Sequence, residues 1–347
     1  MSSKWLALFI FLGGLYILPF MLGYAGWYSI KEYREFLFFM PMQQLFLIGP
    51  VLYFYCKSLL NENFVLRKKD WLHFLPAMTY LLYSLIVFIT DMWVLDSFYF
   101  YADGRDKDLD FWYQFAGLLS MLYYLVLSLK HYRYYRKFTV QEVSFADDIA
   151  YKWIKHFMVA FGAILLLRVL FFILNPEWGG FGSKYWYYLC FSVLSFYIAI
   201  TGYSHTVKSN FNFNFREVDL HLSDAAIDTA FSADKKQWVQ KIDSLFQNDA
   251  IYKDPNLTLN DVAGRLRTNR NIVSGVINQE FQMNFNDFVN KRRVEAIMKK
   301  LGQQEHKKST LLGIALDCGF NSKATFNRAF KKHTGLTPKQ FIRTKNL

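Results

Sequence analysis

Hydrophobic and polar positions change their pattern twice along this chain. Apolar residues form long runs up to about position 203, a polar stretch follows, and apolar residues then return at helical spacing. Six of the early runs are long enough for a helix to cross a hydrocarbon core, which takes about 20 residues. Trp and Tyr mark many of their ends, as expected at a membrane interface. We therefore predict six membrane spans: Trp5–Trp27, Phe36–Tyr55, Trp71–Thr90, Phe111–Leu129, Trp153–Leu174 and Tyr185–Tyr203.

The second of these spans is interrupted by polar residues and prolines. Gln43, Gln44, Pro41 and Pro50 predict a kinked or partly re-entrant segment. Prolines in other spans can open cavities, and the many aromatic residues then favour an apolar pocket for a small-molecule ligand. The first span has an alternative interpretation as a signal peptide cleaved at "GYAG", but its apolar core is too long for one.

Loop charges predict the orientation. Basic residues gather in alternate loops, which is typical of the cytoplasmic side, whereas the loop between the third and fourth spans is acidic. With an even number of spans, both termini face the cytoplasm of a multi-pass inner-membrane protein. The basic residues are Lys57, Arg67, Lys68 and Lys69 between the second and third spans, and Lys130, Arg133, Arg136, Lys137 and Lys152 between the fourth and fifth.

Signals for metal binding or catalysis are weak. The acidic "DGRDKDLD" resembles a calcium loop but lacks Gly at its sixth position and Glu at its twelfth, so we predict a solvated loop. Cys56, Cys190 and Cys318 are expected to be inert thiols. The sequence has no His, Cys or acidic residues at the spacing of metal ligands and no set of side chains that could act together in catalysis. We therefore predict no catalytic residue, no metal, no cofactor and no enzymatic activity. Arg168 is charged within an apolar run, and a functional role and snorkelling towards the interface both stay open.

A polar connector follows the spans. Its "SADKKQWVQKIDSLFQND" places Trp238, Ile242, Leu245 and Phe246 at helical spacing, with Ser232 or Asp234 as the N-cap. We favour a helix that packs on the C-terminal region; the alternative is a helix that forms a homodimer or relays a signal. The predicted domains are 1–207 in the membrane, 208–252 as linker and helix, and 253–347 as a separate domain.

The charge of the chain is concentrated in that last domain. Residues 253–347 hold 18 Lys and Arg against 7 Asp and Glu, a net charge of +11, whereas the other 252 residues hold 22 against 21. A basic domain of this kind suits a polyanion such as nucleic acid or an anionic membrane.

Two stretches of the basic domain follow one plan, a short helix, a tight turn and a second helix with a polar face, which is typical of a helix-turn-helix. In the first, Thr258 caps a helix with Leu259, Val262, Ala263 and Leu266 inward, and 267–269 forms the turn. The next helix buries Ile272, Val273, Val276 and Ile277. Its outward residues are Asn269, Arg270, Asn271, Ser274 and Asn278.

The second stretch repeats the plan about 50 residues later, after a linking helix from Phe285 to Leu301. Ser309 or Thr310 starts its first helix, Gly319 permits a turn with positive φ, and Gly335 ends its second helix. The expected inward residues are Leu312, Ala315, Leu316, Phe320, Phe326 and Phe330, those of the linking helix are Phe288, Val294, Ile297 and Leu301, and Thr337 with Pro338 starts a last helix. The candidate DNA-binding residues of this stretch are Ser322, Lys323, Thr325, Asn327, Arg328, Lys331 and Lys332.

The quoted residues resemble a known signature. Gly319 to Ser322, then Phe326, Arg328, Phe330, Lys331, Gly335, Thr337, Pro338 and Phe341, resemble the DNA-binding domain of AraC-type transcriptional regulators, over about residues 254–343. The resemblance implies seven helices with two helix-turn-helix units on one long helix, bound in successive major grooves. By position it implies that Asn271, Ser274, Lys323, Asn327 and Arg328 face base edges, whereas charge and reach suggest phosphate contacts for Lys331 and Lys332.

The chain departs from the family pattern at two positions and at its start. Gln282 stands where the family usually has Gly in a turn, and Gly275 stands where a base-reading residue is common. The membrane half resembles the less common membrane-embedded members. Only four residues precede the first span, and such members often carry a further span, so we expect the chain to be short at its start.

Together these patterns predict an all-α protein, a helical membrane bundle followed by a double helix-turn-helix domain. The predicted function is a one-component transcription regulator that binds double-stranded operator DNA and responds to a signal in the membrane. Two alternatives stay open, a DNA-binding protein that the bilayer only tethers and a transporter with an accessory DNA-binding domain. Apart from Arg168 the spans hold few ionisable residues, which argues against transport.

Overall fold

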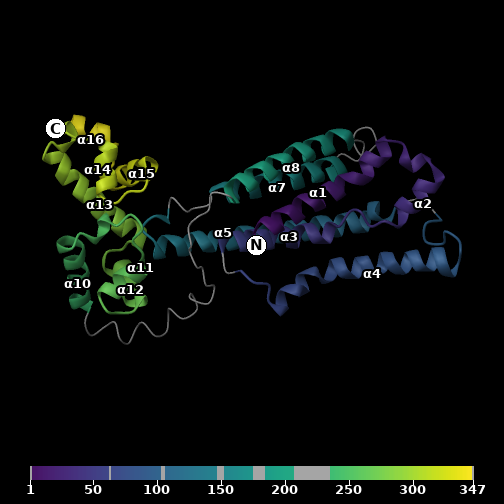
Figure 1. Cartoon of the computed structure of the whole chain (residues 1–347), viewed down its shortest axis with the longest axis horizontal. Coiled ribbons are helices and arrows are strands. Elements are labelled where there is room, and N and C mark those ends of the chain that lie inside the picture. The colour runs from purple at the N-terminus through teal and green to yellow at the C-terminus, as the bar shows by residue number, and fades with distance from the viewer. Residues whose placement is uncertain are drawn as a thin grey trace. The chain divides into compact units, whose positions relative to one another are not determined.

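The computed structural model describes residues 2–61, 64–102, 106–146, 152–174, 184–206 and 235–345 (Figure 1). These residues form helices and turns, without a strand; their one isolated β-bridge joins Val143 to Thr258. The chain forms two compact units. Of the described residues, those up to 132 and those within 152–206 form unit 1, and 133–146 with 235–345 form unit 2.

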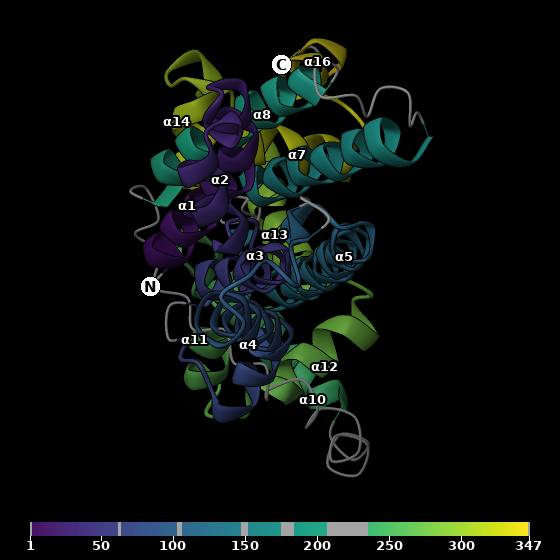
Figure 2. The ribbon, with the colours of Figure 1, turned by 90° about the vertical axis from the view of Figure 1, so that its right-hand side faces the viewer.

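Unit 1 is a helical bundle with mostly apolar surfaces. Within it α1 packs against α3 and α8, and α7 lies beside α8 (Figure 1 and Figure 2). Its elements are α1 (Ser2–Tyr24), the 3-10 turn Trp27–Ser29, α2 (Lys31–Phe39), α3 (Leu45–Leu60), the 3-10 helix Lys68–Phe74, α4 (Leu75–Ile89), the π-helical Thr90–Val94, the 3-10 turn Lys107–Leu109, α5 (Phe111–Glu142), α7 (Lys152–Val169), the π-helical Leu170–Leu174 and α8 (Lys184–Thr206).

Within the described part of the chain, four helical segments are long and apolar enough to cross a membrane. They are Ser2–Tyr24, Lys68–Val94, Phe111–Glu142 and Lys184–Tyr203. Helix α3 has only 16 residues, and α7 has 18 and includes Lys152, Lys155 and Arg168. Within the described residues, length and composition therefore support four of the six predicted spans, and the other two remain predictions.

The predicted second span is broken, as its polar residues suggested. Helix α2 ends at Phe39 and α3 begins only at Leu45. Between them Gln43 is fully buried, and its side-chain amide donates to the Tyr16 carbonyl at 2.9 Å. Its backbone N–H donates to a carboxylate oxygen of Asp108 at 2.9 Å. The break is therefore held by hydrogen bonds to neighbouring segments rather than by proline alone.

The acidic loop before α5 is not the solvated loop that we predicted. Asp106 is 7% exposed and Asp108 is 3% exposed. Their carboxylates accept hydrogen bonds from backbone N–H groups and from the hydroxyls of Tyr28 and Tyr80, which replace water. Burial, with the nearby charge of Asp108, raises the pKa of Asp106 to about 7. Asp103 lies outside the described residues.

Arg168 is packed into the bundle rather than snorkelling. Its side chain is 4% exposed, and Nη2 donates to the backbone carbonyl and the side-chain oxygen of Gln114 at 3.0 and 2.5 Å. The guanidinium lies 5.6 Å from the centre of the Tyr16 ring. It borders a cavity of about 30 Å³, room for a water molecule. The aromatic residues of this cavity are Phe9, Tyr16, Phe161, Tyr187 and Phe191.

Unit 2 is built on one central helix. Its elements are α10 (Lys235–Asn248), the 3-10 turn Ile251–Lys253, α11 (Leu259–Arg265), α12 (Arg270–Glu280), α13 (Phe285–Gly302), the 3-10 turn Glu305–Lys307, α14 (Leu311–Asp317), α15 (Lys323–Thr334) and α16 (Pro338–Thr344). The first half of α13 lies in one hydrophobic core with α10, α11 and α12, and the second half lies in another with α14 and α15. Its predicted inward residues Phe288, Val294, Ile297 and Leu301 are all buried. One uninterrupted helix thus joins two cores.

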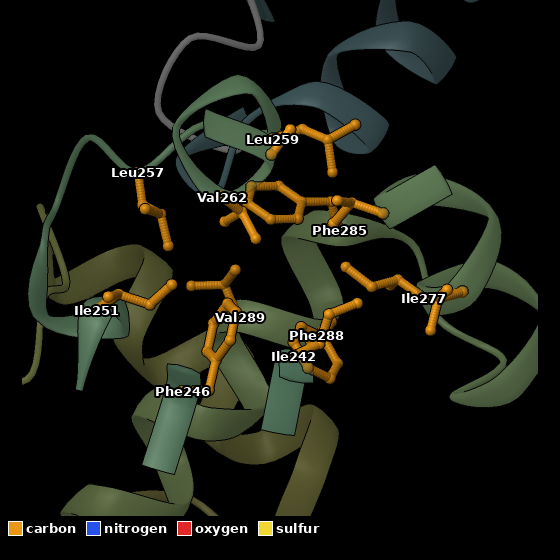
Figure 3. Packing of buried hydrophobic residues seen from close by; sticks show 13 residues of the cluster. Ile242, Phe246, Ile251, Leu257, Leu259, Val262, Ile277, Phe285, Phe288 and Val289 are labelled. Carbon is orange, nitrogen blue, oxygen red and sulfur yellow. The ribbon is translucent and has the colours of Figure 1, made fainter. Parts of the chain in front are cut away.

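Helix α10 belongs to the first core, as the favoured interpretation of the connector predicted. Ile242 and Phe246 are almost completely buried, and Figure 3 shows them facing Phe288 and Val289 of α13. The Phe246 and Phe288 rings meet edge to face with centroids 4.9 Å apart. The N-cap candidates Ser232 and Asp234 lie outside the described residues.

Candidate nucleic-acid interface

The first helix-turn-helix motif comprises α11, a turn and α12. The Thr258 hydroxyl accepts from the backbone N–H of Asp261, whose carboxylate accepts in return from the Thr258 N–H, a capping box that starts α11. Leu259, Val262 and Ala263 are buried as predicted. The turn contains Arg267 with φ of +51°, a left-handed conformation that costs a side-chain-bearing residue energy.

The predicted residues on α12 lie in different environments. The Asn269 side chain caps the helix by accepting from the Asn271 N–H at 2.9 Å, so this oxygen is already used within the protein. Asn271 and Ser274 are half-buried, and Asn278 is exposed and donates to the Ser274 hydroxyl at 3.3 Å. Arg270 forms an ion pair with Glu142 at 3.5 Å, a contact that the sequence did not suggest.

The second motif comprises α14, a turn and α15. Thr310 caps α14 by accepting from the Gly313 N–H. The predicted inward positions Leu312 and Leu316 are wrong, because these side chains are 37% and 48% exposed. The helix begins at Leu311, and its inward stripe at i, i+3, i+4 and i+7 is Leu311, Ile314, Ala315 and Cys318. Burial raises the pKa of the Cys318 thiol, which keeps it in the unreactive protonated form.

Gly319 makes the turn of the second motif, as predicted. Its φ is +92°, and a Cβ built at this position would lie 2.4 Å from the carbonyl oxygen of Tyr252. Positive φ and the close approach of another backbone segment both require glycine here. After the turn, Phe320, Phe326 and Phe330 are buried in the core.

Helix α15 presents most of the predicted residues to solvent. The Ser322 hydroxyl caps it by accepting from the Thr325 N–H at 3.2 Å. Thr325 itself is 3% exposed and shares a hydrogen bond with the Ser322 hydroxyl, so it does not lie on the exposed face expected for it. The predicted residues that are exposed on α15 are Lys323, Asn327, Arg328, Lys331 and Lys332.

The end of the domain follows the sequence prediction. Gly335 ends α15 with φ of +76°. Thr337 caps α16 in a capping box with Gln340, and Pro338 occupies the first turn. Near the end of α15, Lys332 forms an ion pair with Asp287 at 2.6 Å, while its side chain stays 57% exposed. This Lys is therefore tied to the start of α13 but still reaches solvent.

A short segment that the sequence analysis placed in a membrane loop is part of this unit. After the end of α5, Val143 bridges to Thr258, and the Ser144 N–H donates to the Leu257 carbonyl at 3.0 Å. Val143 and Ser144 are fully buried, and Phe145 and Ala146 nearly so. The segment 142–146 therefore packs beside the first motif as a piece of its structure.

A polar stripe on α13 holds this segment. Asn286 donates to the Ser144 carbonyl at 2.9 Å, and Arg293 donates to the Ser144 hydroxyl at 3.0 Å. Asn290 lies between them and donates to the Asn286 side chain. All three are at most 3% exposed. Their spacing of i, i+4 and i+7 puts them on one face of α13, a signal in the sequence that we did not use.

Comparisons with known proteins identify this domain. A family model described as a helix-turn-helix domain matches residues 262–344. Over 88 residues the chain is 30% identical to the melibiose operon regulatory protein of Escherichia coli (strain K12). The aligned residues make up 25% of this chain and 28% of that protein. Over 55 residues the chain is 46% identical to the probable transcription factor PqrA of Proteus vulgaris. Here the aligned residues make up 16% of this chain and 43% of that protein.

The family model covers only residues in the C-terminal part, and the two relatives match over 88 and 55 residues. The chain spans less than half the length of each of these relatives. No solved structure was found to match the chain. Together with the two motifs on α13, the matches show that the C-terminal residues form a helix-turn-helix domain, and the similarity to these regulators supports a DNA-binding domain of the AraC type.

Proposed function

We propose that the chain is a membrane-embedded one-component transcription regulator whose AraC-type domain binds double-stranded operator DNA. The observation that carries this proposal is the pair of helix-turn-helix motifs mounted on one helix, α13, each with a polar second helix. Such a helix fits the major groove, and two of them on a single domain can read two successive grooves.

The proposed contacts follow from exposure and chemistry. On α15, Lys323, Asn327 and Arg328 are exposed and can reach base edges, where Arg reads guanine and Asn reads adenine. Lys331 and Lys332 suit phosphates. On α12 the proposed base-facing residues are Asn271, Ser274 and Asn278. The proposed phosphate contact is Arg270, and the proposed role of Asn269 is to cap the helix.

Membrane embedding is supported by the long apolar helices of unit 1. Four helical segments have the length and composition to cross a bilayer. The basic residues Lys130, Arg133, Arg136 and Lys137 all lie in the last part of α5, which favours a cytoplasmic position for this helix end. A signal that changes the packing of these helices would then reach the DNA-binding domain on the same side of the membrane as the chromosome.

Genome-wide mapping of DNA bound by the intact protein tests the proposal, with an Arg328→Ala variant as the control. We expect a small set of enriched sites sharing a motif with two half-sites about one helical turn apart, and loss of this enrichment in the variant. Absence of any shared motif would contradict the function. Labelling of Lys345 from outside intact cells would contradict the orientation.

A second candidate function is a tether without sensing. The aromatic cavity beside Arg168 holds only about 30 Å³, but a wider apolar pocket of about 600 Å³, lined by Phe36, Phe39, Leu85 and Phe88 among others, also lies in unit 1, so cavity size does not distinguish a sensor from a tether. Replacing unit 1 by an unrelated six-span anchor distinguishes the two candidates. Regulation that survives the replacement favours the tether, and regulation that is lost favours a sensor.

A further inference from the structure

Helix α5 runs without interruption from unit 1 into unit 2 (Figure 1). Its 32 residues correspond to roughly 48 Å at about 1.5 Å per residue. That is longer than the ~30 Å of a hydrocarbon core. The first part of the helix, to Tyr132, belongs to unit 1, and Arg133 onwards belongs to unit 2. The residues of a single helix thus belong to both units.

The end of α5 docks into unit 2 through a specific set of hydrogen bonds. Besides the Val143 to Thr258 bridge, Ser144 offers three polar atoms, and each is bonded: its N–H to Leu257, its carbonyl to Asn286 and its hydroxyl to Arg293. Arg293 also donates to the carbonyls of Tyr252 and Asp254 at 2.8 and 2.7 Å. A buried guanidinium with this many partners fixes the position of the segment that supplies them.

Removal of the docked segment would be unfavourable. Asn286 and Arg293 are at most 3% exposed, so loss of Ser144 would take an acceptor away from buried donors of both side chains. A buried donor that loses its partner costs more free energy than the hydrogen bond contributed. The docking contact is therefore an anchor, and α5 remains attached to the domain while it moves.

Beside the anchor lies a weaker contact that DNA can compete for. Glu142, the last residue of α5, forms the 3.5 Å ion pair with Arg270, the first residue of α12. The two side chains are 13% and 23% exposed, so the pair is only partly open to solvent. An Arg in the first turn of a recognition helix suits a DNA phosphate, and a carboxylate in the same place repels one.

We propose that the segment Glu142–Ala146 is the docking element that attaches α5 to the DNA-binding domain, and that Glu142 competes with DNA phosphate for Arg270. The inference rests on the proposed DNA-binding function. In the docked state the first motif binds DNA weakly. A shift or rotation of α5 withdraws Glu142, and Arg270 becomes available to DNA, so the helix sets the affinity of the first motif.

The ion pair is tested in the full-length protein in lipid nanodiscs, with an operator obtained from the genome-wide mapping. Glu142→Gln keeps a hydrogen-bonding side chain but removes the charge. We expect it to tighten DNA binding roughly three- to tenfold at low salt. The matched control is Asp249→Asn, which removes one charge from an exposed position of the same unit and should change affinity far less.

A double-mutant cycle separates the proposed competition from a general charge effect. In an Arg270→Gln background, Glu142→Gln should give no gain, because the two residues act through each other. The same gain in both backgrounds, or no gain in the wild-type background, overturns the proposal.

Insertions in α5 test whether the helix carries the effect. One alanine inserted between Arg136 and Lys137, both exposed, turns the docking segment by about 100° relative to the first part of the helix, and seven residues restore nearly two full turns. We expect the variant with one inserted alanine to bind DNA as tightly as Glu142→Gln, and Glu142→Gln should not tighten its binding further. The variant with seven inserted residues should bind with wild-type affinity, and Glu142→Gln should again tighten its binding. Equal affinity of both insertions and wild type would show a passive tether and overturn the inference.

Failure of the inference and failure of the proposed function give different results. If the domain binds operator DNA, Arg328→Ala weakens binding in every form, whatever Glu142 does. If no form binds any DNA sequence specifically, the proposed function itself fails.

Discussion

The two helix-turn-helix motifs share one plan but differ in turn and surface. The first turns at Arg267, a non-glycine residue with φ of +51°, and its α12 carries one basic side chain, Arg270, which is paired with Glu142. The second turns at Gly319 with φ of +92°, and its α15 carries Lys and Arg at four exposed positions.

The difference indicates a division of labour. The second motif carries four exposed basic side chains on α15, and Lys332 among them is paired with Asp287 of α13. The first motif carries a single basic side chain on its recognition helix α12, Arg270, and this side chain is paired with Glu142 at the end of α5. If both motifs bind DNA as we propose, the second brings the larger positive charge on its recognition helix, and the first is the place where the proposed competition acts.

The largest expected effect comes from Gly319→Ala in the turn of the second motif. The new Cβ would lie 2.4 Å from the Tyr252 carbonyl oxygen and 2.9 Å from that of Lys253. We expect a loss of stability on the order of 3 kcal/mol, measured as a lower urea midpoint for proteolysis of the domain in the full-length protein. Gly264→Ala is the control from the first motif, because nothing lies within 4 Å of its Cβ. Equal midpoints for the two variants would show that the turns do not differ as described.

Arg328→Ala should have the next largest effect. If Arg328 reads a base, its loss costs about 1–3 kcal/mol of specific binding and relaxes the sequence preference at one position. Arg328→Lys keeps the charge but not the bidentate geometry, so it should restore nonspecific affinity alone. Fluorescence anisotropy with operator and scrambled duplexes measures both. Full restoration of specificity by Lys would contradict base readout.

Lys331→Ala should weaken binding to every sequence by a similar factor. A phosphate contact contributes to affinity without reading bases, and its loss should lower the salt dependence of log K by about 1. The measurement is a salt titration of operator and scrambled duplexes. Lys331→Arg serves as the control with charge retained. A change in sequence preference without a change in salt slope would be inconsistent with this role.

The smallest expected effect is a gain in stability from a substitution near the first motif. Gln282 has φ of +52° in the turn between α12 and α13, at the position where the family usually has Gly. Gln282→Gly should therefore stabilise the domain by about 0.5 kcal/mol, after the larger entropy of the unfolded glycine is counted. Gln303→Gly, at φ of −80°, should give no gain. The urea midpoints of the two variants decide the point.

Local signals were enough to predict most of the DNA-binding domain. Thr258, Ser322 and Thr337 cap helices where the sequence placed them, and Gly319 and Gly335 have the positive φ expected of them. Such features depend on residues within one turn of each other, so a single sequence contains them. The inward face of α14 was misread because Leu311 and Leu312 are adjacent leucines, and only the start of the helix decides which of them faces the core.

The docked segment could not be predicted by the same means. Ser144 and its partner Asn286 are 142 positions apart, and no periodicity connects them. The hydropathy pattern also predicted that the fourth span ends at Leu129. Helix α5 instead continues to Glu142, through polar and basic residues that a helix accommodates although a membrane core does not. The contact follows from tertiary packing alone, as does the burial of Asp106 and Asp108 by groups from other segments.

Because α13 is continuous between the two cores, the distance between the two motifs is set by the protein and cannot be adjusted to the DNA. An operator must then present its two half-sites at one fixed separation and one face of the duplex. Adding or deleting a few base pairs between them would leave one half-site unread, or would force the duplex to bend and twist at its own energetic cost. Variation among target promoters is therefore expected in the half-sites themselves, with the length of DNA between them conserved.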